Sequence, residues 1–411
     1  MATQALAQAY AACARITRRA AKNFYYAFAS LPREQRQAVY VLYAFCREAD
    51  DVVDSASSMD ALSTLENGVT VLPGGDLLED ASSKGAAGTL ESGVTVLPGG
   101  DLAEDASSKG AAGTLENGVT VLPGGDLLED ASSKGAAGTL ENGVAVLPGG
   151  ELAEGAPSMN ALPTKGARDE TALLLDGRKE DAVASARKGI AKLRERLVAA
   201  AEGRATIPRD LALVDVFEKF GVSPEDLADV VAGVEMDLTR ARYRTFDDLR
   251  DYCYHVASAV GLATLPILNA GVPPTDAMRE HAIDLGLGMQ LVNILRDVAE
   301  DIDRDRVYLP QDDLERFGVD QVAFVRKKMT EPLRLVLAFE SARAAEFLER
   351  GRQLVPLLPR RGRSCPWLLA EIYGRVLQRI IAADYDVFAR RVALRASEKL
   401  ILLATARWRA G

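Results

Sequence analysis

The stretch that decides the fold is QLVNILRDVAEDIDRDR, residues Gln290–Arg306. Asn293, Asp297 and Asp301 recur every four residues in it, and Gln290 falls in the same narrow arc of a helix. Leucine, isoleucine, valine and alanine fill the other side. The pattern therefore predicts an amphipathic helix that buries its apolar side and presents a row of oxygen atoms on the other.

A second acidic face lies near the N-terminus, in YVLYAFCREADDVVD, residues Tyr40–Asp54. On a helix, Asp50, Asp51 and Asp54 share one face with Arg47, and apolar residues occupy the opposite side. Taken alone, such a face is most often just solvated. Two such rows together suit magnesium, which binds to a few carboxylates plus substrate phosphates. We expect the two helices to face each other with Mg²⁺ and a diphosphate between them.

The sequence around these two segments predicts an all-α fold. Apolar residues recur at spacings of three and four in nine stretches, with proline or glycine between many of them. The expected helices are 5–29, 33–55, 180–201, 208–220, 224–239, 246–270, 277–304, 321–354 and 366–389. Gly286-Leu287-Gly288 lies inside one of them without a preceding strand, so we interpret it as a place of close helix packing rather than a dinucleotide loop.

A 25-residue unit, close to TLENGVTVLPGGDLLEDASSKGAAG, repeats from about Ser57 to Ala156. This stretch carries 16 Asp and Glu against 3 Lys, whereas the other 311 residues hold 43 acidic and 46 basic residues. Each unit offers little apolar surface to bury, so we predict a disordered insert at 57–164. A small β-solenoid-like stack is the alternative. Residues 1–56 and 165–411 would together form one catalytic domain.

Composition excludes several classes of protein. Two histidines cannot build a three-histidine zinc site, and the near-neutral body lacks the basic footprint of a nucleic-acid-binding protein. Four well-separated cysteines and an N-terminus without a long apolar run are typical of a cytoplasmic protein with reduced thiols. Rows of acids on helices do not match the single acid pair of a glycosidase.

The body of the chain resembles the squalene/phytoene synthases, which join prenyl diphosphates head to head. The matching segments are KNFYYAFASLP (22–32), YAFCREADDVVD (43–54), EMDLTRARYRTFDDL (235–249), YCYHVASAVG (252–261), QLVNILRDVAEDIDRDRVYLP (290–310) and EIYGRVLQRIIAADYDVFARRV (371–392). The pattern is most similar to bacterial enzymes that make presqualene diphosphate or squalene for hopanoids, with bacterial phytoene synthases a near second.

The resemblance implies a single isoprenoid-synthase-type bundle of helices around a central apolar cavity, with both acidic helices at its mouth. The residues that would bind two or three Mg²⁺ ions with the diphosphate are Asp50, Asp51, Asp54, Asn293, Asp297 and Asp301. Those that would contact the diphosphate or line its site are Arg47, Gln290, Arg296, Arg306, Tyr308 and Tyr385. Tyr252 would handle a proton or stabilise a cation. Tyr252 and Tyr385 as packing tyrosines, and Arg296 as a partner of Glu300, are the alternatives.

The implied reaction condenses two farnesyl diphosphates to presqualene diphosphate or squalene, with NADPH required only if squalene is the final product. The alternatives are condensation of two geranylgeranyl diphosphates to phytoene, another terpenoid enzyme, and a non-catalytic helical scaffold whose repeats bind partners. Peripheral contact with the inner face of a membrane and with downstream isoprenoid enzymes is also expected. The stretch Glu398–Trp408 would either dock on a bilayer or form the last packed helix.

Overall fold

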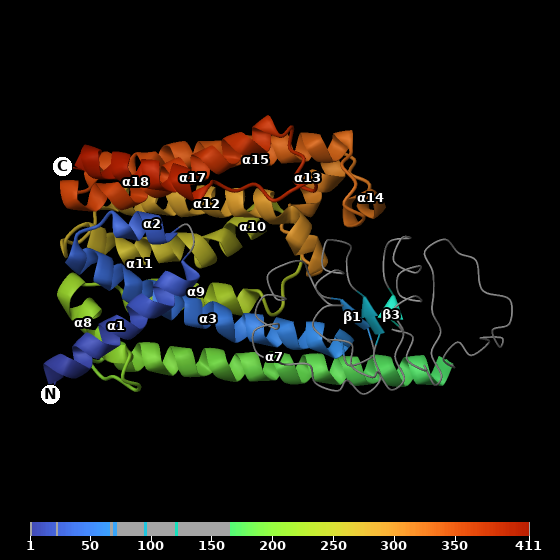
Figure 1. The fold of residues 1–411 in the computed structure, drawn as a ribbon, viewed down its shortest axis with the longest axis horizontal. Helices are drawn as coiled ribbons and strands as arrows, with labels where there is room; N and C mark the ends of the chain where they lie inside the picture. Colours follow the sequence, from blue (N-terminus) through green and yellow to red (C-terminus); the bar gives the residue numbers. More distant parts are fainter. Residues whose placement is uncertain are drawn as a thin grey trace, which may run out of the picture. The chain divides into compact units, whose positions relative to one another are not determined.

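A computed structural model gives the fold (Figure 1). It describes the backbone of residues 2–21, 24–65, 69–71, 94–96, 120–121 and 165–410, and the side chains of 3–21, 24–53 and 181–406. Two compact units divide the chain: Met1–Asp54 with Val183–Gly411, and Ser55–Ala182. The first unit is helical throughout its regular structure, as the periodicity predicts.

The N-terminal helices are α1 (Ala2–Ala20), α2 (Phe24–Ala29) and α3 (Arg33–Leu65). The single helix expected over 5–29 is therefore wrong in its continuity. Thr17 Oγ1 donates to the carbonyl of Cys13, one turn back, and to that of Tyr40 in α3. Such back-bonding by threonine bends helices, and here it occurs in the last turn of α1.

After the repeats the chain continues through α7 (Lys165–Ala201), α8 (Asp210–Phe220), α9 (Pro224–Met236), α10 (Phe246–Cys253) and the π-helical turn η1 (Tyr254–Ser258). Then follow α11 (Ala259–Leu268), α12 (Asp276–Asp303), α13 (Gln311–Arg316), α14 (Gln321–Val325), α15 (Glu331–Arg352), α16 (Leu354–Leu357), α17 (Arg360–Ala382) and α18 (Ala396–Ala410). None of these helices, within the part described, is long and apolar enough to span a membrane.

Two of the expected C-terminal helices differ from the structure. The helix expected over 321–354 is divided, because Lys327 adopts a left-handed φ of 54° and a new helix starts after Thr330 with Pro332 in its first turn. The helix expected over 366–389 ends at Ala382, where Asp384 and Tyr385 have φ of 52° and 60°. These breaks follow from backbone conformation, which apolar periodicity does not report.

Helix α12 packs against α15, α17, α11 and η1 (Figure 1). A Cβ on Gly286 would lie 2.6 Å from the Cα of Ser258 in η1, and one on Gly288 would lie 2.7 Å from the backbone nitrogen of Leu348 in α15. Both glycines therefore allow close approach of neighbouring helices, which confirms the interpretation of the Gly286-Leu287-Gly288 segment.

The repeats contribute three short strands, β1 (Val69–Val71), β2 (Val94–Val96) and β3 (Thr120–Val121). They pair in parallel in the order β1-β2-β3, and Thr70 pairs with Thr95, which pairs with Thr120. Each partner is one repeat further along the chain, which is the register that stacked units would adopt. The remainder of 66–164, on which the expectation of disorder rests, lies outside the described residues.

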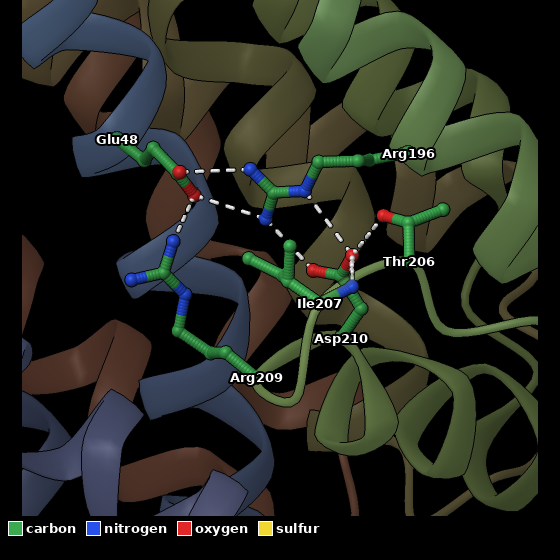
Figure 2. A network of polar contacts seen from close by, with 6 residues as sticks. All are labelled: Glu48, Arg196, Thr206, Ile207, Arg209 and Asp210. Carbon is green, nitrogen blue, oxygen red and sulfur yellow. Dashed lines mark hydrogen bonds and ion pairs between the residues drawn. The ribbon is translucent and has the colours of Figure 1, made fainter.

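A buried ionic network joins the helices on either side of the repeats (Figure 2). Arg196 of α7 donates to Glu48 of α3 at 2.7 Å and to Asp210 of α8 at 2.7 Å. Arg209 also contacts Glu48, and Thr206 donates to Asp210 at 2.8 Å. The chain therefore leaves α3 and returns through α7 with these helices held together inside the first unit.

Candidate functional site

The acidic face of α3 carries its predicted residues in the middle of the helix. Arg47 forms an ion pair with Asp51 one turn away, at 2.5 Å, and Asp50 and Asp51 are exposed. The backbone of Asp54 belongs to the same helix, but its side chain lies outside the described residues. Burial raises the pKa of Tyr43 on this helix to about 12, against the opposing effect of Arg47, so the phenol stays neutral.

The face of α12 places Gln290 and Asn293 one turn apart. Asn293 Nδ2 donates to Gln290 Oε1 at 3.2 Å. Asn293 Oδ1 is buried and has no hydrogen-bond partner among the described residues. A buried amide oxygen without a donor is unfavourable, and a hard cation would satisfy it.

The next turn of α12 concentrates opposite charges. Arg296 donates to Asp297 Oδ1 at 2.7 Å, and Arg391, from the segment after α17, donates to the same oxygen at 2.8 Å. Burial acts to raise the pKa of Asp297, but the hydrogen bonds from these two arginines outweigh it and hold the pKa below its ordinary value. Arg296 thus pairs with its sequence neighbour, whereas Glu300 lies 3.0 Å from Arg391.

One turn further, Asp301 lines a small pocket together with Arg306, Tyr308 and six apolar residues, including Phe324 of α14. Burial, and secondly the charge of Asp297, raise the pKa of Asp301 to about 7. Burial and the charge of Asp297 therefore outweigh the opposing charges of Arg304 and Arg306. Three residues that the sequence assigned to one site share this pocket.

Aromatic rings connect the two acidic helices. The Phe24 ring lies 6.2 Å from that of Tyr43 on α3 and 6.4 Å from that of Tyr373 on α17. Tyr373 in turn interacts with Asn293 and Arg296 on α12. The polar faces of α3 and α12 therefore border a common aromatic surface.

Tyr252 belongs to a buried cluster of three tyrosines. Its ring centroid lies 5.2 Å from those of Tyr243 and Tyr308. Its hydroxyl contacts Asp237 at 3.3 Å and the Tyr308 hydroxyl at 3.4 Å. Arg306 Nη1 donates to Tyr308 at 3.4 Å. The structure thus brings Tyr252, Arg306 and Tyr308 together around Asp237.

The residues present fit a magnesium site with substrate, although they do not form a closed cage. No three His, Cys, Asp or Glu side chains converge on one point among those described. An open arrangement of this kind is what Mg²⁺ favours, because it keeps waters and binds substrate phosphates. The unpartnered oxygen of Asn293 and the high pKa of Asp301 are the observations that support the fit.

The C-terminal region carries Tyr385, which the sequence assigned to the diphosphate site. Tyr385 is partly buried and packs against the core, in a segment that continues to Arg391 and α18. Helix α18 buries Leu402 and Ala406 and packs on α17, so it is the last packed helix, although Leu400 and Ile401 remain exposed.

Arg391 and Asp237 were both missed. Neither residue belongs to a helical row of similar residues, and only the tertiary fold brings each of them to the site. Their places within the matching segments ADYDVFARRV and EMDLTRARYRTFDDL were the available signal.

Comparisons with known proteins agree with this picture. The chain is 37% identical over 209 residues to phytoene synthase 3 of Zea mays, covering 50% of this chain and 49% of that protein. It is 39% identical over 210 residues to 15-cis-phytoene synthase of Synechocystis, covering 49% and 62%. The chain thus spans about half to three fifths of the length of these relatives.

Solved structures show the same fold. A dehydrosqualene synthase bound to a ligand has a TM-score of 0.61 at 22% identity, covering 99% of this chain and 98% of that one. A squalene synthase from Alicyclobacillus acidocaldarius has a TM-score of 0.58 at 20% identity, covering 94% and 99%. The profile of the squalene/phytoene synthase family matches residues 17–69 and 168–398, well over half of the sequence. This chain therefore belongs to the squalene/phytoene synthase family.

Proposed function

We propose that this protein is a prenyltransferase that condenses two prenyl diphosphates head to head. The polar face of α12 is the observation that carries the proposal. This face presents Asn293, Asp297 and Asp301, and arginine side chains are hydrogen-bonded to these residues or lie near them. This face offers oxygen ligands for a cation and guanidinium groups for a diphosphate within a few turns of one helix. Membership of the family supports the same reaction.

Mg²⁺ is the proposed cofactor, held by Asp50, Asp51 and Asp54 from α3 and by Asn293, Asp297 and Asp301 from α12. When bound, it would neutralise charge on the departing diphosphate. Of these groups, Asp297 is already ionised in the structure because of its two arginines, whereas Asp301 has a pKa of about 7. Asp301 therefore gains its negative charge near neutral pH.

The chain's own residues bind the substrate and protect the reaction. Arg47, Arg296 and Arg306 would contact diphosphate oxygens, because the guanidinium fork matches phosphate geometry. The apolar sides of α11 and α12, with Leu262, Leu295 and Val298 buried, exclude water that would trap a carbocation. Tyr308 would contact the diphosphate near Arg306, and Gln290 and Tyr385 would line the diphosphate site.

The length of the prenyl chain is the finer part of the proposal. The motifs favour farnesyl diphosphate and a squalene-type product, whereas the relatives in Zea mays and Synechocystis are phytoene synthases, which favours geranylgeranyl diphosphate at least as strongly. Both donors therefore belong in the assay. A requirement for NADPH would accompany squalene and not phytoene.

The proposal is tested with Asp297→Ala. Pyrophosphate release from farnesyl and geranylgeranyl diphosphate in Mg²⁺ is measured for the wild type and the variant, and we expect the variant to lose about 10²-fold or more. Asp303→Ala is the matched control, because Asp303 lies on the same helix with 64% of its side chain exposed and pairs with Lys327. Unchanged turnover in Asp297→Ala would contradict the proposal.

A further inference from the structure

Asp237 lies directly after α9 and accepts hydrogen bonds from two tyrosines of different segments. Tyr252 Oη donates to Asp237 Oδ2, and Tyr308 Oη donates to Oδ1, each at 3.3 Å. The two phenol oxygens are 3.4 Å apart. Each oxygen of the carboxylate therefore serves one phenol.

The cluster is rigid because its rings pack face to face. Tyr252 and Tyr308 have ring centroids 5.2 Å apart with planes inclined by 24°, and Tyr243 stacks on Tyr308 at 5.7 Å. All three side chains are buried. The phenols cannot turn away from Asp237 without breaking this packing.

Asp237 is also connected to the expected diphosphate site. Arg306 Nη2 donates to the backbone carbonyl of Asp237 at 3.3 Å, and Nη1 lies 4.0 Å from Oδ1. Arg306 and Asp301 line the same pocket as Tyr308. The carboxylate thus stands behind the tyrosines and beside the arginine, with 18% of its side chain exposed.

Both phenols keep their protons in this setting. Burial, and secondly the charge of Asp237, raise the pKa of Tyr308 to about 12 and raise that of Tyr252 well above its ordinary value. The Tyr252 hydroxyl is within donor distance of both Asp237 and the Tyr308 hydroxyl, and its oxygen keeps lone pairs that can accept another proton. A proton relay through Tyr252 needs a final proton acceptor, and Asp237 is the carboxylate that is hydrogen-bonded to Tyr252.

We propose that Asp237 is a positioning residue that orients Tyr252 and receives its proton when the cyclopropane ring closes, an inference that rests on the proposed function. The C–H bond of the condensed prenyl cation breaks, and its electron pair forms the ring bond. The proton passes to Tyr252 Oη, while the proton that Tyr252 held passes to Asp237 Oδ2. A neutral phenol and a neutral carboxylic acid remain, and the exposed edge of Asp237 returns the proton to water.

The first test compares Asp237→Asn with Asp229→Asn. The substitution at Asp237 keeps the shape but removes the proton acceptor, so kcat is expected to fall by about 10²-fold while KM and the thermal midpoint stay unchanged. Asp229 of α9 is the matched control, since it accepts a hydrogen bond from the phenol of Tyr254, in η1, at 3.2 Å. Its variant is expected to keep wild-type kcat.

A double-mutant cycle distinguishes action through Tyr252 from support of Arg306. In a Tyr252→Phe background, Asp237→Asn is expected to lower kcat no further, whereas in an Arg306→Lys background its full effect is expected. Additive losses with Tyr252→Phe would overturn the inference, and so would wild-type kcat in Asp237→Asn. If Asp237→Asn does not fold, Asp237→Glu, which keeps the charge beside Arg306, takes its place in the cycle with the same expected coupling.

The proposed function and the inference about Asp237 can be contradicted independently. If the wild type condenses neither donor, the proposed function is wrong and the cycle is not reached. If the wild type condenses a donor and the cycle shows no coupling between Asp237 and Tyr252, the inference about Asp237 is wrong and the proposed function stands.

Discussion

At the scale of single residues, α12 carries polar side chains whose interactions are incomplete. Asn293 Oδ1 is buried without a partner in the described region, and Asp301 is half-buried near Asp297. The four-residue spacing predicted that these groups share a face. It could not predict Arg391, because that arginine is 94 residues from Asp297 and reaches it through the path of the C-terminal segment.

The raised pKa of Asp301 makes the protein's stability depend on pH. The folded state holds the Asp301 proton more tightly than the unfolded chain, so this contribution is full below pH about 4 and is lost as the pH rises through about 7. Asp301→Asn removes it. Without divalent ions, we expect the free energy of unfolding of the variant to rise relative to that of the wild type by about 2–3 kcal/mol as the pH increases from 5 to 8.

Urea unfolding of both proteins at the two pH values measures this difference. Equal differences at pH 5 and pH 8 would mean that Asp301 has an ordinary pKa in the folded protein. The same comparison with Asp303→Asn controls for removal of an exposed carboxylate from the same helix.

Arg391 is predicted to contribute to diphosphate binding. Its guanidinium lies 2.8 Å from Asp297 and 3.0 Å from Glu300, so it is within the proposed site. Arg391→Ala is expected to raise KM for the prenyl diphosphate by about tenfold, because a hydrogen bond to a charged group contributes roughly 1.5–3 kcal/mol. Arg390→Ala removes the same charge from the neighbouring residue and should leave KM unchanged. Steady-state kinetics with an unaltered KM in Arg391→Ala would refute this role.

At the scale of elements, ion pairs on another side of the helix hold the acidic helix α3 in place. Glu48 adjoins Arg47 in sequence but contacts Arg196 and Arg209 instead of the site (Figure 2). The side chain of Asp210 is 3% exposed and depends on Arg196 for its countercharge. The network therefore sets how α3, α7 and α8 pack.

Breaking this network should destabilise the fold strongly. Arg196→Ala leaves the Asp210 carboxylate buried without its arginine, for which we expect a loss of about 3–5 kcal/mol in the free energy of unfolding. Arg194→Ala is the control, because its pair with Glu235 has 47% and 39% of the side chains exposed and should contribute at most about 1 kcal/mol. Urea titration measures both, and similar small losses would show that the network is not important for stability.

Helix positions were largely predictable from the sequence, and their interruptions were less so. Apolar spacing placed α8, α9 and α12 within three residues of their observed bounds and found the start of α3, but α3 continues to Leu65, ten residues beyond its predicted end. It missed the breaks at Lys327 and at Asp384-Tyr385, since left-handed backbone at a residue other than glycine has no signature in periodicity. Arg391 lies in the segment after the second break. Apolar periodicity therefore failed to predict both this break and the position of Arg391.

At the scale of the whole molecule, the chain combines a catalytic unit with an acidic repeat array that enters shortly after Asp54. Composition and repeat length predicted an insert at 57–164, whereas the second compact unit is Ser55–Ala182. The near-neutral charge of the remaining 311 residues shows that the overall charge of −10 comes from the repeats.

Replacing Ser57–Thr164 with a short Gly/Ser linker is expected to leave turnover intact. The ionic network holds α3 and α7 together within the catalytic unit, so the two helices keep their packing without the repeats. Turnover and thermal midpoint of the shortened protein measure the effect. A folded protein that has lost turnover would instead assign the repeats a role in access to the site.

Identification of the reaction product is the most direct test of the proposed head-to-head condensation. Purified protein is incubated with Mg²⁺ and either farnesyl or geranylgeranyl diphosphate, with and without NADPH, and the extracted products are identified by mass. We predict a C30 or C40 head-to-head product from one donor, absent when Mg²⁺ is chelated. A folded protein that yields neither product from either donor would contradict the assignment.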